Sequence, residues 1–194
     1  MAMAERLKKR MTLEEFFDWQ QRQDRNYELV DGVPVLTVKA MTGASVRHDT
    51  VTVNVIVSLG SQLRGSPCRP RTSDQSIVTS RGTRRPDVSV ECGQPDDRSL
   101  ATEDPRVVVE VLSPSTTRYD RFQKLEEYKQ HKAIRVILLI DTELPRVTVW
   151  RKDADGQWTS AEKSGLTAVI DLPEIGASLP LADIYADLSF EPEA

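Results

Sequence analysis

The sequence predicts an α/β domain: a mixed sheet with a parallel centre, antiparallel hairpins at its edges and flanking helices. Two strand patterns of the buried type, residues 107–113 and 135–141, enclose a helical pattern at about 118–131. A strand, a crossover helix and a second strand form a βαβ unit, so these two strands are expected to be parallel. Turn signals between other strand patterns predict the antiparallel hairpins.

The first third of the chain predicts a short helix, a hairpin and a longer helix. Thr12 to Glu15 form a capping box, so an amphipathic helix should run to about residue 23. Residues 27–35 form strand patterns around Asp31-Gly32, a pair that favours a tight hairpin turn. Residues 47–64 fit a helix with one buried side, since apolar residues recur at four-residue spacing: Val51, Val55, Leu59 and Leu63.

The remaining elements are mostly strands. Residues 71–79 and 86–91 are expected to be strands joined by a turn at Arg81-Gly82, followed by a polar loop over 93–105. Residues 146–152 and 157–161 flank an Asp-Gly turn and predict a second hairpin. Residues 169–172 and 178–181 predict edge strands. Together the elements predict one domain over residues 11–190.

Composition places the chain among globular proteins. It has 194 residues, of which 39% are hydrophobic and 29% charged. No apolar run approaches the roughly 18 residues of a membrane span, and the first residues lack the apolar core of a secretory signal. We therefore expect a cytoplasmic protein with no membrane partner, in which Cys68 and Cys92 are free thiols.

Arginines gather between residues 64 and 85, although the formal net charge of the chain is −4. The segment contains one acid, Asp74, among six arginines: Arg64, Arg69, Arg71, Arg81, Arg84 and Arg85. Such a strip could bind a nucleic-acid backbone. An ordinary solvated loop edge explains the same pattern equally well.

Two acids in strand patterns predict a metal site. Glu110 lies within an apolar run, where an ionised carboxylate is costly to bury unless a partner offsets the cost. If the strands pair with Asp87 opposite Glu110, the two carboxylates could bind one Mg²⁺, with a backbone carbonyl near Val111 as a further ligand. Such a site is suited to phosphodiester hydrolysis.

Three other residues are candidates for the same site. On the helix over 118–131, Phe122 and Leu125 mark the expected buried side, and Lys124 lies about 40° around the axis from Tyr128. Lys124 could bring its ammonium to the carboxylates, or it could cover apolar surface. Glu28 is either a site acid or a solvent-facing strand residue. His48 is either a substrate contact or a structural residue at a helix start.

Three segments together resemble the Uma family of restriction-endonuclease-like proteins: Arg85-Pro86-Asp87-Val88, residues 109–116 and residues 120–128. Residues 27–32 and the helix of His48 are similar to the N-terminal part of that family, and the resemblance spans about residues 11–188. It implies the restriction-endonuclease-like fold of the PD-(D/E)XK nuclease superfamily and a divalent-metal site.

The resemblance also implies roles for individual residues. Asp87 matches the aspartate of the PD element and Glu110 matches the (D/E) element. Leu112 departs from the pattern, because the superfamily places its lysine there. In the Uma family that lysine lies on the following helix, which corresponds to Lys124, and Glu28 matches an early acid that such nucleases often add.

These observations predict an endonuclease that depends on Mg²⁺ or Mn²⁺ and hydrolyses DNA, with Arg85 and His48 as substrate contacts. The alternative is a catalytically inactive module that binds nucleic acid or another partner on the same fold. A third hypothesis is a metal-dependent hydrolase for another phosphoester. Cutting both strands of a duplex suits two-fold symmetry, so the sequence is also compatible with a homodimer.

Overall fold

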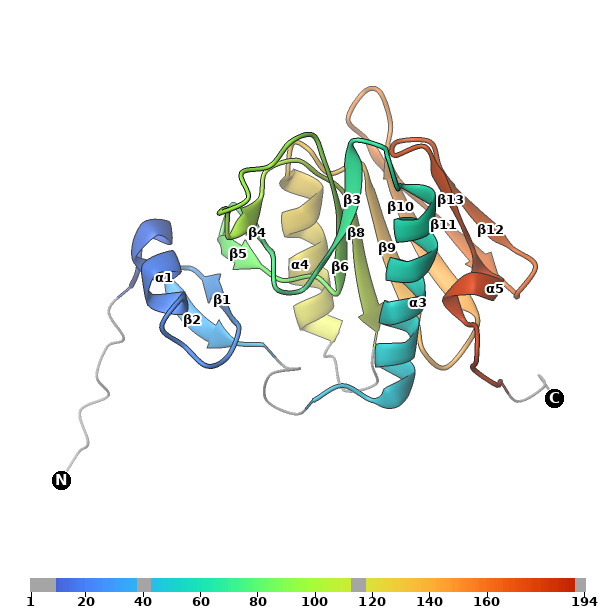
Figure 1. Cartoon of the computed structure of the whole chain (residues 1–194), viewed down its shortest axis with the longest axis horizontal. Helices are drawn as coiled ribbons and strands as arrows, with labels where there is room; N and C mark the ends of the chain where they lie inside the picture. Colours follow the sequence, from blue (N-terminus) through green and yellow to red (C-terminus); the bar gives the residue numbers. More distant parts are fainter. Residues whose placement is uncertain (1–9, 38–42, 113–117, 191–194) are drawn as a thin grey trace.

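The computed structural model describes residues 10–37, 43–112 and 118–190, and its centre is a mixed sheet (Figure 1). Among the described residues this sheet has six strands in the order β11-β10-β9-β8-β6-β3. Their bounds are β3 (Cys68–Thr72), β6 (Val88–Cys92), β8 (Pro105–Leu112), β9 (Val136–Asp141), β10 (Arg146–Lys152) and β11 (Trp158–Ser164). The motif residues 113–117 lie outside the described part of the chain.

The parallel centre predicted from the sequence is confirmed. Strands β8 and β9 are parallel, with Val107 paired to Val136, and helix α4 (Arg118–Gln130) connects them. The other neighbours in this sheet are antiparallel. The α/β fold class therefore stands as predicted.

Helices α3 (Val46–Gln62) and α4 cover opposite faces of the central sheet (Figure 1). Side chains of β8 alternate between these faces, as in any strand. One face is buried with α3 through Val107, Val109 and Val111, whereas Val108 packs with Leu125 and Tyr128 of α4. By the same alternation, Glu110 faces α4.

A second sheet lies beside the first, with strand order β2-β1-β5-β4-β7. It contains β1 (Tyr27–Val30), β2 (Val33–Leu36), β4 (Ser76–Thr79), β5 (Gly82–Arg84) and β7 (Ala101–Thr102). A β-carbon on Gly82 would lie 2.0 Å from the carbonyl oxygen of Leu29, so only glycine lets β5 approach β1 this closely. This contact joins the N-terminal hairpin to the rest of the domain.

Two expectations for this region were wrong. The expected strand over 71–79 is divided into β3 and β4, which belong to different sheets and are separated by a turn with a hydrogen bond from the Gln75 N–H to the Thr72 carbonyl. The expected loop over 93–105 contains the short strand β7, which pairs in parallel with β4. Short polar strands of this kind carry little periodic signal.

The ends of the described chain complete the core. Helix α1 (Leu13–Gln20) begins at the predicted capping box and buries Phe16. Strands β12 (Val169–Leu172) and β13 (Ala177–Pro180) form an antiparallel pair, followed by the short helix α5 (Leu181–Ile184). No helix in the described ranges is long and apolar enough to cross a bilayer.

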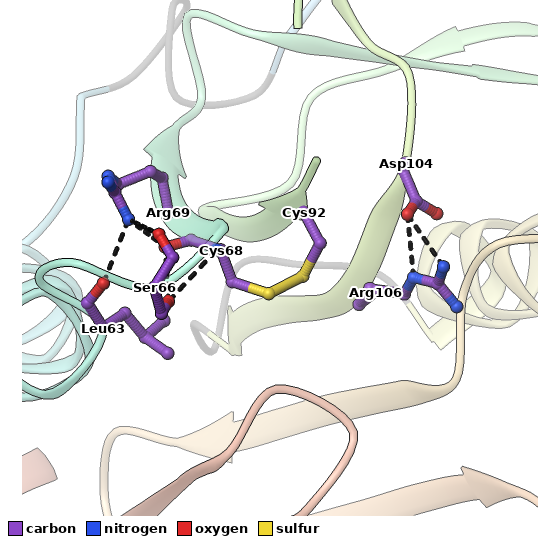
Figure 2. The surroundings of a disulfide bond; sticks show 7 residues. All are labelled: Leu63, Ser66, Cys68, Arg69, Cys92, Asp104 and Arg106. Atoms are coloured by element: carbon purple, nitrogen blue, oxygen red, sulfur yellow. Dashed lines mark hydrogen bonds and ion pairs between the residues drawn. A yellow bond between two sulfur atoms is a disulfide. The ribbon is translucent and has the colours of Figure 1, made fainter. Parts of the chain in front are cut away.

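The two cysteines form a disulfide bond, which corrects the expectation of free thiols (Figure 2). Cys68 and Cys92 stand directly opposite each other at the ends of β3 and β6, with their α-carbons 3.9 Å apart. Their separation of 24 residues gave no sign of this pairing, because it depends on the register of two strands. The bond ties β6 to the segment that follows α3.

Phe122 is a further correction. Its side chain is 62% exposed, whereas Leu125 and Tyr128 form the buried side of α4. The helix is therefore rotated away from the orientation that Phe122 suggested. Lys124 remains at the margin of the buried side and is partly covered.

Candidate active site

Asp87 immediately precedes β6, which pairs with β8. The register pairs Val88 with Val109 and ends one residue before Asp87 and Glu110, so the direct pairing of these two acids stays a prediction. Asp87 is 2% exposed, and its Oδ2 accepts a hydrogen bond of 2.7 Å from the backbone N–H of Val111. The strand itself therefore fixes this carboxylate.

His48 lies beside the other oxygen of Asp87, on the α3 side. Its Nε2 lies 3.4 Å from Asp87 Oδ1, and both side chains are buried. Ser45 caps the helix by accepting a hydrogen bond from the His48 N–H, which fixes this first turn. His48 is thus a neighbour of the Asp87 carboxylate. Its role in binding substrate stays a prediction.

Glu110 is bound from the α4 side by Tyr128. The Tyr128 hydroxyl donates a hydrogen bond of 2.7 Å to Glu110 Oε1. Burial and the nearby Glu110 charge raise the pKa of Tyr128 well above its usual value, so the phenol keeps its proton at neutral pH. Glu110 therefore has a permanent donor on one oxygen.

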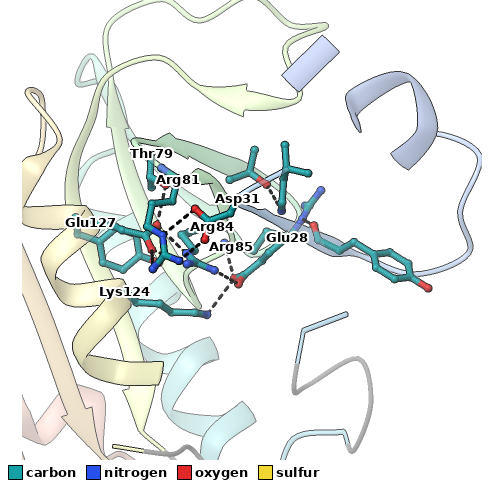
Figure 3. Close-up of polar contacts among 12 residues, drawn as sticks. Glu28, Asp31, Thr79, Arg81, Arg84, Arg85, Lys124 and Glu127 are labelled. Carbon is teal, nitrogen blue, oxygen red and sulfur yellow. Dashed lines mark hydrogen bonds and ion pairs between the residues drawn. The ribbon is translucent and has the colours of Figure 1, made fainter. Parts of the chain in front are cut away.

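Lys124 and Tyr128 are one helical turn apart, so α4 presents both on the same face. The Lys124 ammonium donates a hydrogen bond of 2.9 Å to Glu28 Oε1 (Figure 3). The lysine is thus directed to Glu28, and its predicted approach to the Asp87 and Glu110 carboxylates stays a prediction. Glu28 reaches it from β1, on a different part of the chain.

Glu28 belongs to a buried ionic cluster that it forms with Arg84, Lys124 and Glu127 (Figure 3). Arg84 donates to Glu127 at 2.9 and 2.5 Å and to Glu28 Oε2 at 3.2 Å. The Arg85 N–H adds a bond of 3.0 Å to Glu28 Oε1. Protein donors thus bind both oxygens of Glu28, which makes it a counter-ion for Lys124 and Arg84.

The charges of this cluster favour ionised groups. Burial opposes ionisation of Glu28, but the Lys124 ammonium, the Arg85 N–H and Arg84 together lower its pKa below the usual 4.5. Burial likewise opposes the charge on Arg84, and Glu127 and Glu28 outweigh it by raising the pKa of the guanidinium. The cluster is therefore a set of mutually dependent ions.

The arginine strip expected from the sequence is used within the protein. Arg71 pairs with Glu91, Arg81 with Asp31, and Arg84 with the cluster. Arg69 and Arg85 donate to backbone carbonyls. The acceptors of Arg85 are the carbonyls of Tyr27, Ser73 and Asp74. Five of the six arginines thus have partners within the protein, and the DNA-binding strip and the substrate contact of Arg85 stay predictions.

The donors available to a metal are few but of the right chemistry. Within the described ranges no three His, Cys, Asp or Glu side chains are grouped as a ready metal site. Mg²⁺ commonly takes only one or two carboxylates and completes its shell with water and substrate phosphate oxygens. Asp87 precedes β6 and Glu110 lies in β8, the strand paired with β6, so the two carboxylates supply donors of this kind.

The family model of Uma2, described as "Putative restriction endonuclease", matches residues 13–182. The chain belongs to the Uma2 family. The resemblance that the strand and helix motifs suggested is confirmed, and the family match covers every candidate site residue from Glu28 to Tyr128.

Two curated relatives match most of the chain. An uncharacterized protein of Synechocystis sp. is 32% identical over 184 residues, which are 93% of this chain and 94% of the relative. A second uncharacterized protein of the same organism is 28% identical over 166 residues, covering 83% and 92%. These two proteins therefore match the Uma2 chain almost from end to end.

A solved structure confirms the fold. The crystal structure of a putative nuclease belonging to DUF820 from Anabaena variabilis matches with a TM-score of 0.71. It is 16% identical and covers 91% of this chain and 98% of its own. The restriction-endonuclease-like fold predicted from the sequence is thus found in this Uma2 protein.

Sequence reasoning missed three residues around the Uma2 site: Tyr128, Arg84 and Glu127. A usable signal existed for Tyr128, since it lies four residues after Lys124 and so on the same helix face. Arg84 and Glu127 gave no comparable signal, because their pairing joins segments 43 residues apart.

Proposed function

We propose that this Uma2 protein is an endonuclease that depends on Mg²⁺ or Mn²⁺ and hydrolyses phosphodiester bonds of DNA. The observation that carries the proposal is that the Asp87 carboxylate binds the N–H of Val111, the residue next to Glu110, while α4 supplies both the Glu110 partner Tyr128 and the Lys124 ammonium. Membership of Uma2 supports the same reaction class.

Each residue then has a defined task. Asp87 and Glu110 would hold the cation, and the Val111 carbonyl is the predicted backbone ligand. A bound divalent ion polarises the phosphoryl oxygen and lowers the pKa of a bound water. Lys124 stabilises negative charge on the phosphate, which develops as the nucleophile attacks.

The other residues support these tasks. Glu28 holds the Lys124 ammonium directed inward, which replaces the ligand role that the family pattern suggested for it. His48 fixes Asp87 from the α3 side. Since Leu112 occupies the usual lysine position, the ammonium comes from α4 instead of the strand.

The test is cleavage of supercoiled plasmid, linear duplex DNA and single-stranded RNA with Mg²⁺ or Mn²⁺. We expect Asp87→Asn and Glu110→Gln to lose roughly 100-fold or more of the rate, as removal of a main transition-state contact does. Glu126→Gln is the matched control, because Glu126 is on the surface of α4 and pairs with Lys129. Equal cleavage by all four proteins would reject the assignment.

The second candidate is a catalytically inactive module that binds nucleic acid, and Leu112 together with the small set of metal donors favours it. It predicts DNA binding with a steep salt dependence and no metal requirement. Calorimetric titration with Mn²⁺ separates the two: binding that Glu110→Gln abolishes contradicts the inactive module. Sedimentation of the same protein tests the homodimer.

A further inference from the structure

The Tyr128 side chain is more polar than its packing requires. Its ring is fully buried against the α4 face of the sheet, in a cluster with Val108, Leu125 and Ile137. Phenylalanine would fill the same space without a hydroxyl to satisfy. The hydroxyl instead donates to Glu110 Oε1 at 2.7 Å, which spares both groups the cost of an unpaired polar atom.

We propose that Tyr128 is a positioning residue that holds Glu110 as a metal ligand through one oxygen. This inference rests on the proposed function, because it assigns Glu110 to the cation. With Oε1 bound to the hydroxyl, Oε2 is the oxygen directed to the cation shared with Asp87. Partners of this kind, which orient a ligand without touching the metal, commonly tune metal affinity.

Helix α4 makes this contact specific. The same face that carries Tyr128 carries Lys124, whose ammonium is held by Glu28 at 2.9 Å. The backbone rise between the two residues is about 6 Å, which is four steps along the helix. The position of α4 therefore sets both the direction of the Glu110 carboxylate and the distance from that carboxylate to the ammonium.

The test compares Mn²⁺ binding by the full chain and by Tyr128→Phe, measured by calorimetry and by the electron paramagnetic resonance signal of free Mn²⁺. We expect the dissociation constant to rise about 10-fold, the lower end of the effect seen when such orienting partners are removed. Cleavage by Tyr128→Phe should recover as the Mn²⁺ concentration is raised.

Tyr185→Phe is the matched control. Tyr185 is also a buried tyrosine whose hydroxyl is hydrogen-bonded, to the carbonyls of Asp141 and Arg146. It should keep the Mn²⁺ affinity of the unmodified protein. If Tyr128→Phe is less stable, the rise of its melting midpoint with Mn²⁺ concentration still reports affinity, since a ligand stabilises the folded state by mass action.

The outcomes are distinct. Equal Mn²⁺ affinity of Tyr128→Phe and the unmodified chain overturns the role of Tyr128, while loss of binding in Glu110→Gln would leave the proposed metal site standing. If the unmodified chain binds no Mn²⁺, or Glu110→Gln binds it equally well, the metal site fails and the role of Tyr128 fails with it.

Discussion

Replacing Arg84 tests the buried ionic cluster most directly. Arg84→Met keeps a long side chain but removes the guanidinium, which donates to Glu127 twice and to Glu28 once. Arg84 is 3% exposed, and Glu28 and Glu127 are 5% and 3% exposed. The substitution therefore leaves two carboxylates buried without their shared cation.

The expected loss of stability is large. Removing one partner of a buried ion pair costs about 3–5 kcal/mol of unfolding free energy. For a chain of this size each kcal/mol lowers the melting midpoint by about 2–4 °C, so the midpoint should fall by about 6–20 °C. Thermal unfolding at pH 7 followed by circular dichroism measures this shift.

Arg106→Met is the control. Arg106 also bonds one carboxylate twice, Asp104 at 3.0 and 2.8 Å, but both side chains are about one third exposed (Figure 2). Water competes for such a pair, so its loss should cost about 0–1 kcal/mol. A midpoint for Arg84→Met no lower than that of Arg106→Met would refute the reasoning about the cluster.

Three further outcomes are expected. The fold lowers the pKa of Glu28 below 4.5, so its contribution to stability is present above pH 4.5 and is lost as pH falls through the folded-state pKa. Below pH 4.5 the unfolding free energy of Glu28→Gln should therefore fall less steeply with acidification than that of the unmodified protein. Parallel curves for the two proteins would contradict this. The Cys68–Cys92 bond closes a loop with a sequence separation of 24. On the chain-entropy model its reduction should lower the free energy of unfolding by about 3.5 kcal/mol, seen as a lower melting midpoint in dithiothreitol. An unchanged midpoint would refute this. Lys124→Met should lower cleavage about 100-fold. Lys129→Met should not, because the Lys129 ammonium pairs with Glu126 and lies over the Trp150 ring; equal rates would remove Lys124 from the reaction.

The central sheet could be predicted because its signals are local. Runs of β-branched residues around a helical pattern predicted β8, α4 and β9, and parallel pairing followed from the length of the connection. Period and turn chemistry thus determine the central strands, whereas the position of Asp87 relative to Glu110 stays a prediction.

The rest depends on contacts between distant segments. The sequence left two interpretations of the arginines between residues 64 and 85, because the acids that pair with them lie elsewhere in the sequence, as Asp31 does for Arg81. The disulfide was missed for the same reason, since only the register of β3 and β6 brings Cys68 to Cys92. The expectation that Phe122 marks the buried side of the helix was wrong because an apolar residue on a helix need not be buried.

In the proposed reaction, the placement of the ammonium on α4 makes cleavage depend on the N-terminal hairpin. Lys124 is held by Glu28 on the N-terminal hairpin, which joins the domain through the short strand β5. Edge elements of this kind open locally at lower free energy than the core does. Cleavage should therefore fail on heating before the central sheet melts, so that enzyme activity reports the docking of a hairpin that contains neither Asp87 nor Glu110.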